Sequence, residues 1–298
     1  MSEISSHAKG LLLTAIGGLA LTVDIPLIRL AEGEAWSVML LRTGATFAVA
    51  LVIWAVWRSF SSNAPQLIPG WSGLAVAALY GLGSVTFITA VYATSTANLV
   101  FILAFTTMFA ALLSWVFLKE RPSNATMLAM LVMILGVGII VSDSVGTGNL
   151  FGDAMALLSA FIIASAITVS RASGKDMGFT ALIGVIFPFV IAVFMVADVG
   201  YRVAQPWWIL FNGAVVMPIS FFCLATGPRY ISGPEVAMFY LLETVLAPVW
   251  VWIIFSDVPT TRSLVGGTIL IAALVAHSIW QLLQGRRRRT ADPVNYPI

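Results

Sequence analysis

The sequence contains few charged residues. Lys, Arg, Asp and Glu make up 9% of its 298 residues, whereas 60% are hydrophobic, and the mean hydropathy is +0.99. Soluble domains carry about 25% charged residues, so this deficit excludes a soluble globular protein and indicates that lipid surrounds most side chains. The apolar runs are continuous and about 20 residues long, which favours membrane helices over the short alternating strands of a membrane barrel.

Residues that bind metals and nucleotides are also scarce. Cys223 is the single cysteine, and the two histidines, His7 and His277, are far apart in the sequence. This composition excludes a disulfide within the chain, a thiolate metal cluster and a multi-histidine metal site. The sequence has no glycine-rich phosphate loop with its lysine, so ATP hydrolysis within this chain is excluded as well. We expect neither a metal nor a cofactor.

The sequence does contain a series of long apolar runs, which predict an all-α integral membrane protein. A secretory signal after Lys9 is the alternative for the first run, but that run continues to Leu30. The ten predicted transmembrane helices are Leu11–Leu30, Trp36–Trp57, Trp71–Tyr92, Ser95–Leu118, Ala125–Ser142, Leu150–Arg171, Phe179–Ala197, Trp207–Thr226, Ser232–Phe255 and Ser263–Leu283.

The basic residues of the connections lie mostly on one side of these helices, the side of the N-terminus, and this bias predicts that both termini are cytoplasmic. The basic run Arg286–Arg289 could bind nucleic acid or anionic lipid. Because it directly follows a membrane helix, we interpret it as a cytoplasmic anchor and expect no nucleic-acid partner.

An internal repeat divides the chain into two halves. A shift of 137 residues superposes Trp71 on Trp208 and Pro122 on Pro259, among other pairs, and a shift of 142 aligns Gly10 with Gly152. We therefore expect one five-helix repeat over residues 1–146, a second over 147–285 and a basic tail over 286–298. An odd number of crossings inverts the second repeat in the membrane, an arrangement typical of alternating-access transporters.

Motifs at the ends of the two halves carry a likeness to known proteins. Trp115–Pro122 reads WVFLKERP and Leu241–Trp252 reads LLETVLAPVWVW, followed by GGTILIAALV from Gly266 to Val275. The pattern resembles the drug/metabolite transporter superfamily and, within it, the EamA-type proteins of two five-helix halves. Asp257 departs from the family's usual Glu, which Glu120 matches in the first half.

This resemblance implies ten helices around a central cavity and a secondary transporter that exports small metabolites across the bacterial inner membrane. The expected substrates are apolar or aromatic amino acids, as for YddG-type exporters. Another class of metabolite or drug is the alternative. The partners we expect are a small-molecule substrate and the lipid bilayer, and the sequence is compatible with a monomer.

The ninth predicted helix, Ser232–Phe255, carries an ionisable group near the middle of the membrane. Glu243 lies about 16 Å from its start, and helical spacing places Phe239 and Tyr240 on the same side. Pro248 cannot donate to the carbonyl of Thr244, so a kink is expected there. An intramembrane carboxyl group is costly and indicates a functional site inside the bundle, although a protonated Glu that holds two helices together is the alternative.

The repeat suggests partners for Glu243 in the fourth predicted helix. Thr106 corresponds to Glu243, and Asn98 corresponds to Glu235, which lies near the cytoplasmic end of its helix. We hypothesise that a zwitterionic substrate places its ammonium group near Glu243 and its carboxylate near donors such as Asn98, with aromatic walls around it. Glu243 could instead carry a coupling proton, and the two roles are compatible.

Asp24 and Arg42 form a second candidate group. Counted along their helices, both lie in the outer third of the membrane at nearly the same height, so they could form an ion pair. Pairing lowers the cost of burying either charge. The pair could open and close as an outer gate, or it could be a static structural contact.

The remaining candidates are a polar stripe and a set of prolines. Tyr80 and Ser84 share one side of the third predicted helix with Phe87 and could line the cavity, although such stripes also serve packing. The predicted helices of the second half are interrupted by three prolines, Pro188, Pro218 and Pro248. In the first half, Pro26 alone interrupts a helix. The three prolines could act as hinges or produce a fixed curvature.

Other classes of protein fit the sequence less well. An intramembrane hydrolase could pair Ser84 with His277, but the two residues are expected at different depths. A structural or sensory membrane protein explains neither Glu243 nor the repeat, and a channel explains the kinks less well than a carrier does.

Overall fold

A computed structural model describes residues 6–61, 64–119, 121, 123–147, 149–175, 177–226 and 233–291. The described part of the chain is helical apart from its connections and one isolated antiparallel bridge between Gly33 and Val203. Its helices are α1 (Ser6–Leu21), α2 (Asp24–Leu30), α3 (Ala35–Phe60), α4 (Gly70–Ala93), α5 (Thr96–Leu103), α6 (Thr106–Leu118), α7 (Asn124–Thr147), α8 (Leu150–Ser173), α9 (Gly178–Gly184), α10 (Ile186–Val199), α11 (Pro206–Phe211), the π-helix η1 (Asn212–Val216), α12 (Met217–Thr226), α13 (Gly233–Phe255) and α14 (Thr261–Ala291).

Long apolar helices dominate the fold. Within the described residues, eight helical stretches are long and apolar enough to cross a membrane, and two shorter apolar stretches cover Leu242–Phe255 and Thr261–His277. The chain is therefore a multi-pass membrane protein. Apart from the breaks described below and the first residue of the fourth range, each predicted range is helical in its described residues. The count of ten crossings stays a prediction. Helix α14 continues to Ala291, so the described part of the expected tail at 286–298 is helical.

Several of the predicted spans are divided into two helices. Turn residues Thr22 and Val23 separate α1 from α2, and Val185 separates α9 from α10. Pro26 and Pro188 follow these breaks and cannot donate to the carbonyl groups of Thr22 and Gly184, so each proline weakens the helix just before it.

The fourth predicted span is also divided, and it contains no proline. Ala104 and Phe105 separate α5 from α6, where the hydroxyl groups of Thr106 and Thr107 donate to the carbonyl oxygens of Leu103 (2.7 Å) and Ala104 (3.0 Å). Threonine hydroxyls that bond back to the preceding turn bend helices. Breaks therefore occur in both halves, because α1–α2 and α5–α6 are divided in the first half and α9–α10 in the second. Only the break between α5 and α6 could not be anticipated from a proline.

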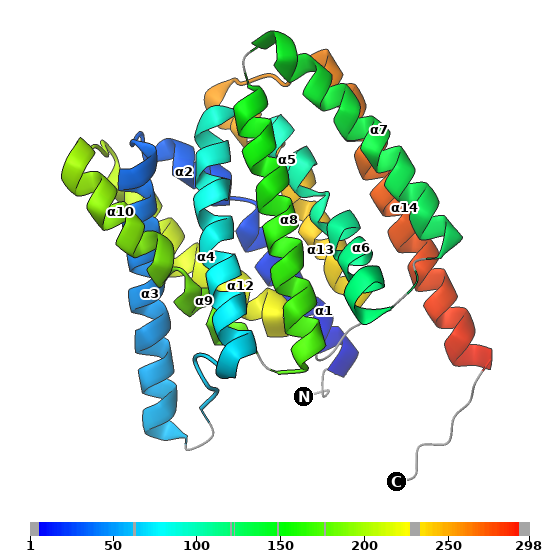
Figure 1. Cartoon of the computed structure of the whole chain (residues 1–298), viewed down its shortest axis with the longest axis horizontal. Helices are drawn as coiled ribbons and strands as arrows, with labels where there is room; N and C mark the ends of the chain where they lie inside the picture. Colours follow the sequence, from blue (N-terminus) through cyan, green and yellow to red (C-terminus); the bar gives the residue numbers. More distant parts are fainter. Residues whose placement is uncertain are drawn as a thin grey trace.

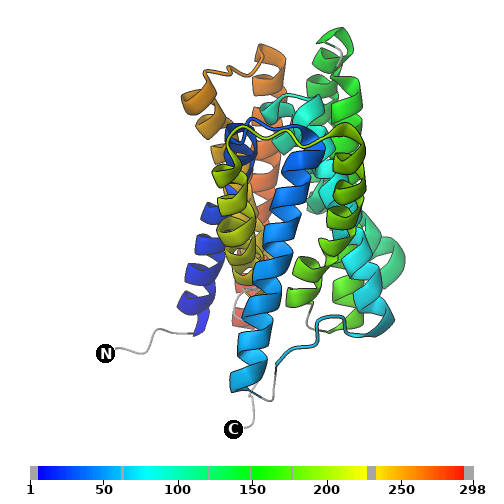
Figure 2. The same ribbon diagram turned by 90° about the vertical axis from the view of Figure 1, so that its left-hand side faces the viewer.

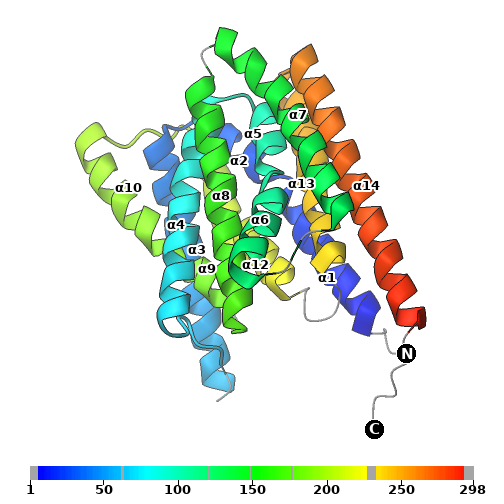
Figure 3. The same cartoon turned by 45° about the vertical axis from the view of Figure 1, so that its right-hand side comes forward.

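The helices stand side by side in one bundle (Figure 1). Helices α3 and α10 form one edge and the antiparallel pair α7 and α14 forms the other, with α4, α8, α5, α6, α13 and α1 between them. The beginning of α1 and the end of α14 lie at the same end of the bundle (Figures 2 and 3). We call this end the terminal end and the opposite one the distal end.

Two connections cross and bind each other at the distal end. One is the link from α2 to α3, and the other is the link from α10 to α11. The N–H of Glu34 in the first link donates to the carbonyl of Arg202 in the second (2.8 Å). In the opposite direction, the N–H of Ala204 donates to the carbonyl of Glu32 (3.2 Å), and that of Gln205 to the carbonyl of Ala31 (3.0 Å). We call this set of backbone hydrogen bonds the distal clasp. It fixes the position of the end of α2, which carries charged residues described below.

Close helix contacts hold the bundle together. A Cβ on Gly136 would lie 2.8 Å from the carbonyl oxygen of Gly266, so these two glycines let α7 and α14 cross with their backbones in contact. Outward faces remain apolar, with Phe117, Phe194 and Ile253 well exposed. Such exposed side chains fit a surface that contacts lipid.

Candidate functional site

An ion pair lies buried inside the bundle. Asp24 is the first residue of α2 and Arg42 lies about two turns into α3. Nη2 of Arg42 donates to both carboxylate oxygens of Asp24, at 3.1 and 2.9 Å. Both residues are nearly inaccessible, with 2% of Asp24 and 5% of Arg42 exposed. The structure therefore brings together the two residues that the sequence placed at equal height. Their role as a gate stays a prediction.

Asn212 completes this pair, and sequence analysis missed it. Its side-chain oxygen accepts from Nε of Arg42 (3.1 Å), and its side-chain nitrogen donates to Oδ1 of Asp24 (2.6 Å) and to the Asp24 carbonyl (3.2 Å). A fully buried amide thus bridges both charges. The signal was present, because an Asn within an apolar span needs a partner, just as Asp24 and Arg42 do.

A π-helix positions Asn212. The N–H of Met217 donates to the carbonyl of Asn212, five residues earlier, where an α-helix would bond four residues back. Pro218 follows and lacks an N–H, which weakens the regular ladder at this point. Single π-helical turns within membrane helices often mark functional sites, because they reorient side chains.

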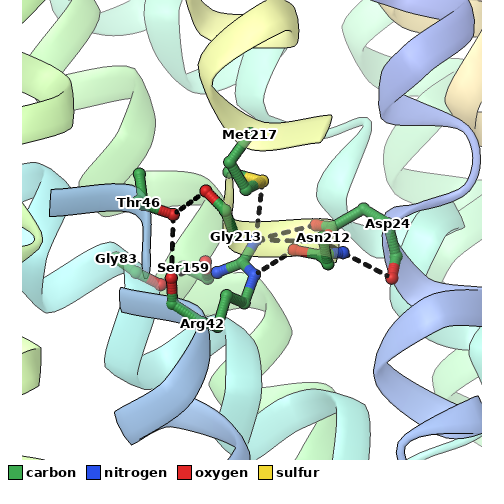
Figure 4. Close-up of polar contacts among 8 residues, drawn as sticks. All are labelled: Asp24, Arg42, Thr46, Gly83, Ser159, Asn212, Gly213 and Met217. Carbon is green, nitrogen blue, oxygen red and sulfur yellow. Dashed lines mark hydrogen bonds and ion pairs between the residues drawn. The ribbon is translucent and has the colours of Figure 1, made fainter. Parts of the chain in front are cut away.

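The surroundings hold the guanidinium group from several sides (Figure 4). Sδ of Met217 lies 3.1 Å from Nη2 of Arg42, and the ring of Phe87 lies 5.6 Å from the guanidinium carbon. The hydroxyl of Thr46 donates to the carbonyl groups of Arg42 (2.8 Å) and Gly213 (2.9 Å), which ties α3 to η1. We call Asp24, Arg42 and Asn212 the central cluster.

Glu243 approaches the central cluster from α13. It lies near the middle of that helix, and its carboxyl group is within electrostatic range of both Asp24 and Arg42. Its side chain is partly buried.

The position of Asn98 beside a substrate at Glu243 stays a prediction. Asn98 lies in the first turn of α5 at the distal end, and its side-chain oxygen accepts from the hydroxyl of Ser263 at the start of α14 (2.5 Å). It is buried and joins two helices. Thr106, the repeat counterpart of Glu243, donates its hydroxyl to its own helix at the break between α5 and α6.

The aromatic and hydroxyl candidates lie on several helices. Tyr80 makes an edge-to-face contact with Phe221 of α12 at 6.0 Å between ring centres. The hydroxyl of Ser84 is buried and has no hydrogen-bond partner among the described atoms. Phe239 is partly buried and lies where α1 crosses α13. The two helices are close there, since a Cβ on Gly18 would lie 2.7 Å from the carbonyl oxygen of Phe239. The side chain of Tyr240 lies outside the described part of the structure.

The predicted hinge prolines differ in their surroundings. Pro188 lies just after the break between α9 and α10, and Pro218 follows the π-helix. Pro248 lies inside α13, which the structure shows as one helix. Hinge motion at all three positions stays a prediction.

Comparison with known proteins places this geometry in context. Residues 8–142 match the EamA-like transporter family. An uncharacterized transporter of Synechocystis sp. is 24% identical over 220 residues, which cover 68% of this chain and 63% of that protein. The chain thus spans less than two thirds of the length of this relative. Both likenesses are to transporters.

A solved crystal structure resembles the whole bundle. The two superpose with a TM-score of 0.65 and 14% sequence identity, over 92% of this chain and 98% of the other. At this level of identity, the likeness concerns the fold alone.

Proposed function

Because residues 8–142 match the EamA-like transporter family, we propose that the protein is a secondary transporter that carries small organic metabolites by alternating access. The buried charges of the central cluster support this proposal, since intramembrane ionisable groups mark substrate and ion pathways. The expected substrates are amino acids with apolar or aromatic side chains.

The packing of the helices supports two inverted five-helix repeats. In the proposed repeat, α8 corresponds to α1 with α2, and α4 corresponds to α11 with α12. Helix α8 packs along α4 just as α1 packs along α12, and α8 contacts α5 and α6 just as α1 contacts α13. The pairs α7 with α14 and α5 with α13 each join a helix to its own counterpart. These are the contacts that a two-fold axis in the membrane plane would produce.

The contacts at the two ends of the bundle also fit a two-fold axis in the membrane plane. At the distal end, the clasp joins the α2–α3 and α10–α11 links. At the terminal end, the corresponding links run from α3 to α4 and from α8 to α9. Nζ of Lys175 in the second link donates to the carbonyl of Pro69 in the first (3.0 Å). The hydroxyl of Thr180, at the start of α9, donates to the carbonyl of Leu67 (3.1 Å). We assign the terminal end to the cytoplasm of a bacterial cell, because basic residues collect there.

The charges of the site favour a substrate with a positive group. Asp24 is already paired with Arg42, and Glu243 lies on α13, which packs against α2, so an ionised Glu243 would need a cation other than the paired Arg42. An ammonium group of an amino acid would neutralise this carboxylate, as would a proton on Glu243. The packing of α13, with its intramembrane carboxyl group, against the helix that begins with the paired Asp24 is the observation that carries the proposal of a zwitterionic or cationic substrate.

Replacement of Glu243 by Gln tests this function. We expect counterflow of labelled amino acids into liposomes loaded with unlabelled ones to fall about tenfold or more, because a charge-assisted hydrogen bond to the ammonium group contributes about 1.5–3 kcal/mol. The measurement compares wild type and Glu243→Gln at equal protein content. Wild-type protein that exchanges no amino acid would contradict the proposed substrate class.

A second measurement separates substrate binding from proton coupling. Counterflow exchanges substrates and needs no net proton movement, whereas uptake driven by a pH gradient does. If Glu243→Gln keeps counterflow but loses gradient-driven uptake, Glu243 carries the coupling proton and does not bind the ammonium group.

A further inference from the structure

A cavity of about 370 Å³ opens at the distal end, apart from the central cluster. It lies where the ends of α2, α4 and α13 meet, beside the distal clasp. Its lining combines one cation, one anion and two aromatic rings. The residues that line it are Arg29, Glu32, Gly33, Val91, Tyr92 and Phe255.

Arg29 supplies the positive side of this cavity. Its Nη1 donates to Oδ2 of Asp257 at 2.7 Å, and its guanidinium carbon lies 5.8 Å from the centre of the Phe255 ring. A guanidinium group has five N–H donors, so the contact with Asp257 leaves donors for a second carboxylate. The Arg29 side chain is 25% exposed, which makes those donors accessible.

Glu32 supplies the negative side, and the backbone fixes its position. It follows α2 in a left-handed conformation, with φ at 47°, which a residue other than glycine rarely adopts. Its N–H donates to the carbonyl of Arg29, and its own carbonyl accepts from Ala204 in the distal clasp. Such backbone strain persists only where surrounding contacts impose it, and here they hold Glu32 on the cavity wall.

We propose that this cavity is a second binding site for free amino acids with aromatic or apolar side chains. Arg29 binds the carboxylate, Glu32 binds the ammonium group, and Tyr92 and Phe255 contact the side chain. Its volume lies in the range of small-molecule sites, which is about 300–1,000 Å³. The proposal rests on the proposed function, since it names the same substrate class.

Helix α2 connects this cavity with the central cluster. Asp24 begins the helix and Arg29 lies in its last turn, five residues later, or about 7.5 Å along the axis. The seven-residue helix follows a break at Thr22 and Val23 and ends at the distal clasp. An amino acid bound at Arg29 would therefore lie at the distal end of α2, the helix that begins with Asp24 of the central cluster.

Equilibrium dialysis of the purified, full-length protein with labelled tryptophan tests the proposal directly. We expect wild type to bind two molecules per chain, whereas Arg29→Gln and Glu243→Gln each bind one. The distal site of Arg29→Gln should lose at least tenfold in affinity. Arg29→Gln that binds as much tryptophan as wild type would overturn the proposal.

Asp257→Asn separates ligand binding from a purely structural ion pair. This variant removes the partner of Arg29 but keeps the guanidinium group, so we expect it to bind two molecules with undiminished affinity. If Asp257→Asn loses the second molecule as Arg29→Gln does, the ion pair only holds the fold and the proposal fails. A thermal unfolding curve for each variant shows whether it is folded.

The outcomes distinguish this site from the proposed function. Suppose that wild type shows counterflow but binds one tryptophan, and that Arg29→Gln binds one as well. This result would overturn the distal site and leave the transporter proposal standing. Wild-type protein that neither exchanges nor binds amino acids would overturn both.

Discussion

Replacing Arg42 by Met is expected to lower the free energy of unfolding by about 3–5 kcal/mol. The change leaves the carboxylate of Asp24 buried and without its cation, and it removes the donor that Asn212 accepts from. A fall in melting temperature on the order of 10 °C follows, measured from the tryptophan fluorescence of detergent-solubilised protein.

The double variant Asp24→Asn with Arg42→Met is the matched control. It removes both charges together, and replacing a whole buried ion pair by neutral groups is often neutral for stability. We expect most of the lost melting temperature to return. If the double variant is as unstable as Arg42→Met alone, the pairing with Asp24 is not the source of the loss.

The same double variant decides whether the pair is a gate. A static contact can be replaced without loss of counterflow once the protein is stable. A pair that must break and re-form in each transport cycle cannot be replaced in this way, so a stable but inactive double variant would support gating.

Much of the architecture could be predicted from the sequence, because hydrophobic runs report burial in lipid directly. The long runs predicted the membrane helices, and the resemblance carried by Trp115–Pro122 is to the family whose model matches residues 8–142. The likeness at Leu241–Trp252 lies outside that match. The height of Asp24 and Arg42 along their helices predicted that they could meet. These inferences needed only helical geometry within single elements.

Features that depend on contacts between distant elements could not be predicted. Asn212 meets Asp24 and Arg42 where η1 places it, and although Pro218 marks an irregularity there, the sequence does not say which way the side chain then faces. The division of α5 from α6 depends on two threonine hydroxyls, where sequence analysis looked for a proline. Asn98 was proposed as a substrate donor from the repeat and from helical spacing, which could not show that its side-chain oxygen accepts from Ser263, 165 residues later.

Replacing Gly213 by Val is expected to destabilise the protein by about 3 kcal/mol, at the upper end of the usual cost of overpacking. Gly213 lies in η1 directly against α3, where a Cβ would overlap the carbonyl oxygen of Arg42 and lie 3.0 Å from Cβ of Ala45. Backbone atoms cannot rotate away as a flexible side chain can. The two elements must therefore separate, which breaks the hydrogen bond from Thr46 to the Gly213 carbonyl.

This separation also reaches the central cluster, because Asn212 precedes Gly213 and would move away from Arg42. We therefore expect Gly213→Val to lose counterflow as well as melting temperature. Gly138→Val is the matched control: Gly138 is also helical, but a Cβ added there would meet no described atom within 4 Å, so the same substitution should change neither quantity appreciably. Valine has a higher helix propensity than glycine, so equal losses in the two variants would show that the cause is neither helix propensity nor the crossing of α3 and η1.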